Sequence, residues 1–196
     1  LMRRTALALA LALMPMNALG QDFDAGLAAA DQGDYATALR EWRPLAEQGN
    51  ASAQFNLGLM YLKGQGVPQD DAEAVRWFRM AAEQGDAEAQ FNLGLMYLKG
   101  RGVPKDDAEA VRWDRLAAEQ GLAEAQSNLG VMYGLGRGVP QDDVTAHMWF
   151  SIAAANGADS GAEGRDIVAK LMTAADITEA WRRAGVCVAS GYRDCD

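Results

Sequence analysis

The chain is poor in the residue types that most often carry chemistry. Among its 196 residues there are two cysteines and one histidine, too few ligands for a zinc site built from those side chains. The formal net charge is −9, and no basic stretch interrupts the acidic sequence. Nucleic acid is therefore not expected as a partner, because its recognition depends on clustered lysine and arginine. No apolar run is long enough to span a bilayer, so we expect no stable membrane insertion.

The longest apolar run lies near the start of the chain. Two arginines precede the nine apolar residues Ala6–Met14, and Ala18-Leu19-Gly20 then supplies small residues suited to cleavage. This order is typical of a secretory signal peptide, which we assign to residues 1–20. The sequence therefore predicts export from the cytoplasm.

Both cysteines, Cys187 and Cys195, lie in the last ten residues. In an exported protein, an even pair at this short spacing is typical of a disulfide. Closing so short a loop stabilises the fold by about 2.5 kcal/mol in the chain-entropy model. We expect this bond to staple the C-terminal tail, residues 186–196.

The sequence is rich in internal repetition. The segment Asn50–Gly85 matches Asp86–Gly121 at 30 of 36 positions, and Leu122–Gly157 matches the second copy at 21 of 36. A repeat of this length is typical of a solenoid, in which each unit buries its apolar face only against its neighbours. The copies predict one architectural module used three times.

Each copy is predicted to form two helices. Asn50 and Asp86 stand at N-cap positions before the first helix, whereas Leu122 breaks this capping pattern in the third copy. Asp70 begins an Asp-x-x-Glu arrangement close to a capping box at the second helix. Gly64 fits a left-handed C-cap between the two helices.

Glycines also recur inside the first helix of every copy, at Gly58, Gly94 and Gly130. A glycine inside a helix costs about 1 kcal/mol relative to alanine. Its repetition indicates that a neighbouring helix passes too close for a methyl group.

The repeated positions resemble those of the Sel-one-like repeat, a relative of the tetratricopeptide repeat. In the first copy the matching residues are Ala51, Ala53, Gln54, Leu57, Gly58, Tyr61, Gly64, Gly66, Val67, Asp70, Ala74, Trp77, Ala81, Ala82 and Gly85. The resemblance implies an all-α fold, an α/α superhelix, and an activity of holding other macromolecules. The common occurrence of this family in bacteria, together with the signal peptide, implies a bacterial protein of the periplasm or one that is secreted.

The remaining segments are shorter than a full copy and are expected to cap the stack. The predicted repeat domain, residues 21–185, then divides into an N-terminal helix pair (21–49), three repeats (50–85, 86–121 and 122–157) and a C-terminal helix pair (158–185).

The sequence contains few of the motifs that are typical of enzymes. No serine is followed three residues later by lysine, and Ser-Asp-Asn and Lys-Thr-Gly do not occur, so the motifs of serine β-lactamases are missing. His147 would have to serve any Ser-His-Asp arrangement, yet a lone histidine at a variable repeat position is more often a surface or packing residue. No catalytic residue, metal or cofactor is predicted. An envelope enzyme acting on peptidoglycan or β-lactams remains the alternative interpretation.

Tryptophans recur on the second helices and are predicted to lie in the core. These are Trp77, Trp113 and Trp149. The position after each tryptophan changes from Phe78 to Asp114 to Phe150. Because a buried site would tolerate aspartate poorly, we expect this position to be exposed.

A stripe on the first helices offers a candidate binding surface for a protein, a peptide or peptidoglycan. It comprises Asn56, Met60, Lys63, Asn92, Met96, Lys99, Asn128 and Met132, with Leu135 in the last lysine position. Related superhelices line their concave face with first helices. The competing interpretation is that the methionines pack between units and the asparagines bond to nearby backbone. The sequence thus predicts a non-catalytic scaffold or adaptor of the cell envelope.

Overall fold

The computed structural model describes residues 22–195, and the predicted signal peptide lies outside them. Over this range the chain forms ten α-helices, one short 3₁₀ turn at Ala169–Leu171 and no β-strand. The α-helices are α1 (Phe23–Asp31), α2 (Tyr35–Glu47), α3 (Ala51–Lys63), α4 (Asp71–Glu83), α5 (Ala87–Lys99), α6 (Asp107–Ala118), α7 (Ala123–Leu135), α8 (Asp143–Ala155), α9 (Asp159–Val168) and α10 (Ala174–Ala189).

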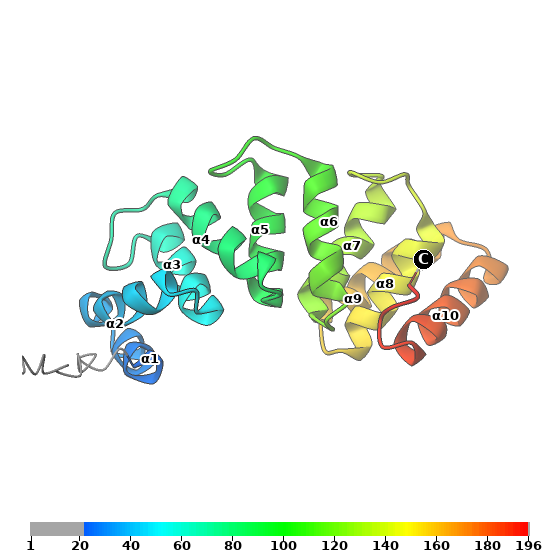
Figure 1. Ribbon diagram of the computed structural model, residues 1–196. Helices are drawn as coiled ribbons and strands as arrows, with labels where there is room; N and C mark the ends of the chain where they lie inside the picture. The colour runs from blue at the N-terminus through cyan, green and yellow to red at the C-terminus, as the bar shows by residue number, and fades with distance from the viewer. Residues whose placement is uncertain (1–21, 196) are drawn as a thin grey trace, which may run out of the picture.

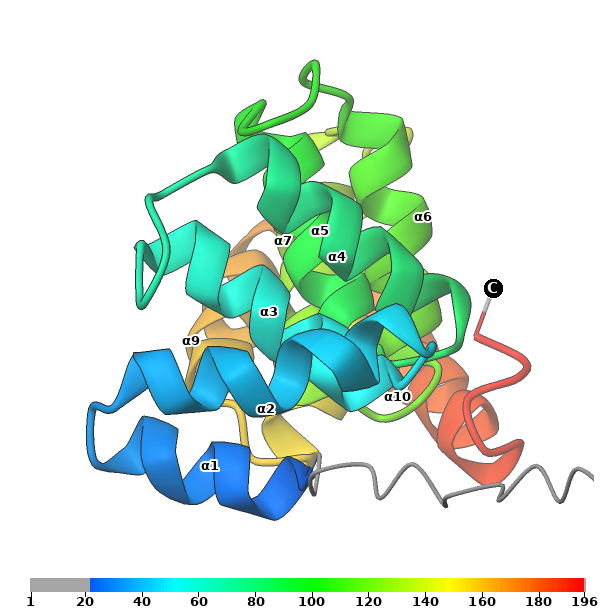
Figure 2. The ribbon, with the colours of Figure 1, turned by 60° about the vertical axis from the view of Figure 1, so that its left-hand side comes forward.

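The helices follow one another in an arc, with α1 and the C-terminal tail at opposite ends (Figure 1). Seen from the N-terminal side, successive helix pairs stack behind one another (Figure 2). The predicted all-α superhelix is confirmed. The last helix runs to Ala189, beyond the boundary at residue 185 that we predicted for the C-terminal pair.

Helix ends follow the predicted capping residues. The side chain of Asn50 accepts from the amide of Ala53 at the start of α3, and Asp86 does the same for α5. Leu122 makes no side-chain cap at the start of α7. Gly64 ends α3 with φ at 68°, a left-handed conformation that strains any residue with a side chain. The capping predictions are confirmed at these ends.

The core runs along the array as successive clusters. Each cluster joins the second helix of one pair to the first helix of the next, and a tryptophan from the following helix completes it. Trp77, Trp113 and Trp149 fill this role and are almost fully buried, as predicted. Since every pair is completed by its neighbour, the stability of the fold depends on stacking.

Buried glutamines add a polar ladder between adjacent pairs. Gln90 on α5 donates from Nε2 to the carbonyl oxygen of Ala82 on α4, at 3.1 Å. Its Oε1 accepts from Gln120 Nε2 at 2.8 Å, so one amide joins α4, α5 and the turn that follows α6. The same arrangement recurs in the flanking units around Gln54 and Gln126.

The helical glycines lie where the two helices of one unit approach most closely. A Cβ at Gly58 would lie 2.5 Å from the ring of Phe78, and one at Gly130 would lie 2.6 Å from the ring of Phe150. Both distances are too short for two carbon atoms in contact. The predicted reason for these glycines is confirmed.

The residue after each tryptophan is buried, so the prediction that this position is exposed was wrong. Phe78 and Asp114 are 0% exposed and Phe150 is 6% exposed. Asp114 lies against Gly94 as the phenylalanines lie against their glycines. Asn128 donates from Nδ2 to Asp114 Oδ2, whereas Oδ1 has no hydrogen-bond partner. Burial raises the pKa of Asp114 to about 8, so this carboxyl group is neutral over most of the physiological range.

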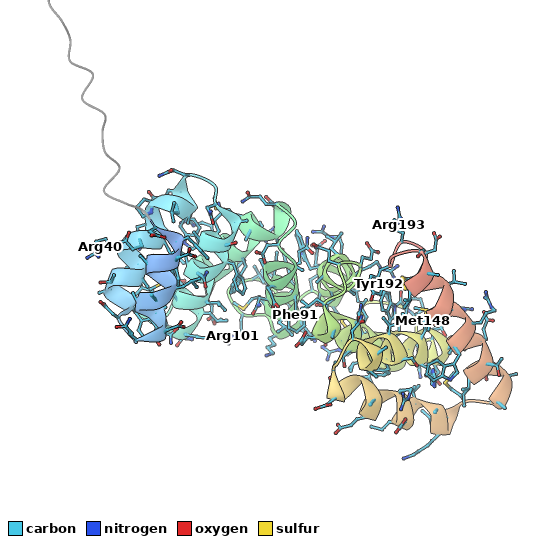
Figure 3. All side chains as sticks on the ribbon, turned by 90° about the horizontal axis from the view of Figure 1, so that it is seen from below. Arg40, Phe91, Arg101, Met148, Tyr192 and Arg193 are labelled. Carbon is cyan, nitrogen blue, oxygen red and sulfur yellow. A yellow bond between two sulfur atoms is a disulfide. The ribbon has the colours of Figure 1, made fainter. Side chains whose placement is uncertain are left out.

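The C-terminal tail is held against the last repeat. Cys187 on α10 and Cys195 form a disulfide, as predicted, and both are buried. Tyr192, which lies on the tail next to Arg193 in Figure 3, accepts at its hydroxyl from Asn156 Nδ2 at 2.9 Å. The tail therefore covers part of the end of the array.

Candidate functional site

The methionines of the predicted stripe lie in the core. Met60, Met96 and Met132 are 2%, 3% and 1% exposed. They share the inner side of the first helices with the buried leucines of the clusters. The prediction that these thioethers form part of an exposed stripe was wrong, and the competing interpretation, packing between units, is confirmed.

The asparagines of the stripe are half-buried and hold structural bonds. Asn56 donates from Nδ2 to the carbonyl oxygen of Ser52 at 3.0 Å, and Asn92 donates to that of Glu88 at 2.8 Å. Asn128 turns instead to the carboxyl group of Asp114. All three amides have a bond within the fold, which reduces what they can offer to a ligand.

Lys63 and Lys99 are exposed at the last turns of α3 and α5, and no ion pair is formed by either within residues 22–195. In α7 the same position holds Leu135, which is 64% exposed. Of the predicted stripe, only these residues present a free side chain. Their role in binding stays a prediction.

Beyond the exposed lysines, on the side of the first helices away from the buried methionines, lies a row of partly buried apolar side chains that our stripe left out. On α3 it consists of Phe55, Leu59 and Leu62, and α5 carries the same three residue types. Phe91, the counterpart of Phe55, lies near the middle of the array in Figure 3. Comparing the helical faces copy by copy would have revealed this row.

The third copy changes the row and opens a groove. Ser127 replaces the phenylalanine, Val131 the leucine, and Gly134 the second leucine. These losses of bulk leave a groove of about 360 Å³ between α7 and α9. Its lining consists of Ser127, Gly130, Val131, Gly134, Leu135, Asp143, Phe150, Ser160, Glu163, Gly164, Ile167, Val168 and Leu171.

The groove is apolar with an acidic margin. Leu135 and Ile167 are each 64% exposed and Leu171 is 72% exposed, so much hydrocarbon faces solvent here. Among residues 22–195 neither Asp143 nor Glu163 pairs with a cation. An apolar groove with a few polar groups at its edge is the usual form of a recognition site.

The single histidine is a packing residue. His147 is 2% exposed, its ring meets the edge of Trp181 at a centroid distance of 5.6 Å, and burial lowers its pKa, with Arg165 adding to the effect and Asp166 opposing it. Ser151 Oγ lies 3.3 Å from His147 Nδ1 and donates to the carbonyl oxygen of His147 at 2.7 Å.

A base needs a third group to orient it and a nucleophile needs nearby oxyanion donors, and this pair offers neither. Both residues lie within helix α8, whose amides are used by the helix itself. Across residues 22–195 no group of three or more His, Cys, Asp or Glu side chains is placed to hold a metal ion. No helix in that part of the chain is long and apolar enough to cross a membrane.

Known structures share this architecture. A Sel1 repeat protein from Oxalobacter formigenes is 43% identical, with a TM-score of 0.61, over 66% of this chain and 97% of that one. The protein c5321, a protective antigen present in uropathogenic Escherichia coli strains and displaying an SLR fold, is 33% identical with a TM-score of 0.61, over 87% of this chain and 46% of that one. Cysteine rich protein B of Helicobacter pylori is 18% identical, with a TM-score of 0.50 over 70% of this chain and 92% of that one, and shares the fold.

No curated protein matches the chain. The profile of the Sel1 repeat matches residues 51–86, 87–122 and 123–157, each offset by about one residue from the units that we predicted. Proteins built from this repeat are generally protein-interaction scaffolds. The stacked helix pairs, the glycines at their crossings and the matched repeats agree: the chain belongs to the Sel1 repeat family.

Proposed function

We propose that this protein is a non-catalytic adaptor of the bacterial cell envelope. It binds a segment of a partner protein across the first helices, with the groove between α7 and α9 as the principal contact. The groove carries the proposal, because it exposes Leu135, Ile167 and Leu171 together beside the carboxylates of Asp143 and Glu163. An exposed apolar patch rimmed by polar groups is typical of a protein-binding surface.

The apolar lining favours a peptide segment over a glycan strand. The most exposed apolar side chains of the groove, Leu135, Ile167 and Leu171, are aliphatic, and no tryptophan or tyrosine lines it. Aliphatic side chains of a partner would be buried there, each contributing about 1.5–3 kcal/mol when fully covered. Peptidoglycan is therefore less favoured as a ligand than a protein or a peptide.

Filling the groove tests the proposal. Gly134→Leu restores the residue of the first two copies, and a Cβ at Gly134 meets only Ala146 Cβ at 3.6 Å, an ordinary contact. A displayed random peptide library is selected on residues 22–196, and the selected peptides are measured by calorimetry. We expect Gly134→Leu to weaken their binding by at least about tenfold without lowering the melting temperature.

Gly185→Leu is the matched control. It makes the same change on α10, where a Cβ meets nothing within 4 Å, and it lies in a second depression of about 390 Å³ bordered by Trp181. If selected peptides lose affinity for this variant and keep it for Gly134→Leu, the proposed site is wrong.

The envelope location is tested separately. Residues 1–20 are fused to an alkaline phosphatase that lacks its own leader and is active only after export. Activity in intact bacteria supports the proposal, and an inactive cytoplasmic fusion protein contradicts it.

A further inference from the structure

The loop of each later repeat docks on the preceding repeat through an arginine. Arg101 donates from Nε to Asp71 Oδ2 at 2.9 Å and from Nη2 to Asp71 Oδ1 at 2.6 Å. Arg137 reaches back to Asp107 with a single bond, from Nη2 to Oδ1 at 3.2 Å, and Lys105 Nζ lies 3.6 Å from the same oxygen. The hydrogen bond from Arg101 lowers the pKa of Asp71, and that from Arg137 lowers the pKa of Asp107. The aspartates at the starts of α4 and α6 thus each bind a guanidinium group.

The residue after each arginine is also restricted by its contact with the start of the second helix. A Cβ at Gly102 would lie 2.2 Å from the carbonyl oxygen of Asp71, and a Cβ at Gly138 would lie 2.2 Å from that of Asp107. Both glycines also have positive φ, at 68° and 70°. The start of the second helix therefore accepts an Arg-Gly dipeptide and rejects a side chain at its second position.

Asp143 is the third residue of this series, and its receptor is open. It stands at the first position of α8, as Asp71 and Asp107 stand at the first positions of α4 and α6. The last helix pair is joined by the short turn Ala169–Leu171 and carries no Arg-Gly loop to place there. Within residues 22–195 the Asp143 carboxylate accepts only from Gln141 Nε2, at 3.4 Å.

This open receptor is part of the wall of the groove between α7 and α9, next to Leu135 and Leu171. If an arginine of a partner segment binds Asp143, the residues next to that arginine in the segment therefore lie over the apolar lining of the groove. Glu163 on the opposite wall adds negative charge, and among residues 22–195 it has no cationic partner. Charge complementarity at a rim directs a cationic segment to such a surface.

We propose that the groove recognises a partner segment containing an Arg-Gly dipeptide beside an apolar residue. The guanidinium binds Asp143, the glycine crosses the start of α8, and the apolar residue lies between α7 and α9. The occupant is a different protein, since Arg101 and Arg137 of a second copy are already engaged within their own chain. This inference rests on the proposed function and specifies the chemistry of its ligand.

A peptide with the sequence of residues 134–141 is the probe, because it contains the Arg-Gly-Val of the third loop. It is titrated into ¹⁵N-labelled protein of residues 22–196 and followed by amide chemical shifts. We expect saturable shifts at millimolar peptide around Asp143, Val131 and Leu171. A bidentate charged pair at a partly exposed site contributes about 1.4 kcal/mol, so Asp143→Asn is expected to weaken binding about tenfold.

Matched changes isolate the two parts of the dipeptide. In the peptide, Arg137→Gln and Gly138→Ala are each expected to abolish saturable shifts. In the protein, Asp159→Asn makes the same charge change on α9, does not line the groove and is expected to leave binding unchanged.

Shifts of equal size in wild type and Asp143→Asn, or no saturable shift at millimolar peptide, would overturn the inference. If Asp143→Asn has no effect while Gly134→Leu abolishes binding of the library-selected peptides, the arginine inference fails and the proposed function stands. If neither variant affects any peptide, both fail.

Discussion

Replacing Asp114 with phenylalanine should stabilise this protein. The first and third repeats hold Phe78 and Phe150 at this position, both buried against Gly58 and Gly130. The second repeat keeps the matching glycine but holds a carboxyl group whose Oδ1 is buried without a partner. Asp114→Phe therefore restores the residue for which the surrounding backbone is shaped.

Two contributions set the magnitude. Burying a phenylalanine side chain stabilises a fold by about 1.5–3 kcal/mol. An unsatisfied buried polar group costs about 1–3 kcal/mol, and that cost is removed. Asn128 loses its bond to Asp114 but can return to the carbonyl oxygen of Glu124, as Asn56 and Asn92 bond to theirs. A net gain of about 3 kcal/mol raises the melting temperature by roughly 6–12 °C for a chain of this size.

The pH dependence supplies a second, independent readout. Burial raises the pKa of Asp114 from its ordinary value of 3.8 to about 8, so between these values the folded protein binds a proton that the unfolded chain has released. The stability that this proton provides is fully present below the ordinary value and is lost as the pH rises toward 8. The free energy of unfolding should fall by roughly 1.4 kcal/mol per pH unit across that window.

Thermal unfolding followed by circular dichroism, at several pH values between about 4 and 9, compares wild type with Asp114→Phe and Asp114→Asn. Both variants should lose the contribution of this residue to the pH dependence, and only phenylalanine should add the packing gain. A melting temperature for Asp114→Phe at or below that of wild type, with the pH dependence retained in Asp114→Asn, would refute the reasoning.

Four further variants test the packing and capping of the array by urea unfolding. Gly130→Ala places a methyl group 2.6 Å from the ring of Phe150 and should destabilise the fold by about 1–3 kcal/mol. Gly134→Ala, whose Cβ is free of clashes, should instead stabilise it by up to about 1 kcal/mol. Equal effects of the two variants would contradict the role of Gly130 in the close packing of the helices. Leu122→Asp supplies the missing cap of α7 and should stabilise by about 1 kcal/mol; a loss of stability would show that this helix start is not limited by its cap. Gln90→Ala removes both hydrogen bonds of the buried amide and should destabilise the fold by about 2 kcal/mol. An unchanged denaturation midpoint would show that these glutamine hydrogen bonds do not stabilise the stack.

Much of the fold could be predicted from the sequence because the same helix pair is encoded in three copies. Helix starts at Asn50 and Asp86 depend on local hydrogen bonds, which are encoded within a few residues. The glycines inside the helices indicated close crossings because nothing else explains their cost. Such features require no knowledge of distant contacts.

The prediction for Asp114 was wrong because a local rule was applied where tertiary packing decides. Aspartate usually avoids burial, but the repeat fixes the position of this side chain beside Gly94 whatever its type. The methionines were misplaced for a related reason: their spacing assigns them to a helix face, yet the neighbouring helix pair determines whether that face is covered.

The groove was missed although its signal was present. Ser127 and Gly134 depart from the larger residues of the first two copies, and this comparison needs only the sequence. Whether such losses leave an open groove depends on α9, whose pair has no full counterpart among the repeats. The absence of an Arg-Gly loop after the third repeat can likewise be seen in the sequence. That such a loop would place an arginine on Asp143 follows only from the pairing of Arg101 with Asp71 in the structure.

Hydrogen–deuterium exchange of the protein with and without a library-selected peptide tests most directly where a partner binds. We expect slower amide exchange in α7, in α9 and at the start of α8, with α1 and α2 unchanged. Protection confined to α10 and its depression, or to the second helices α4 and α6, would contradict it.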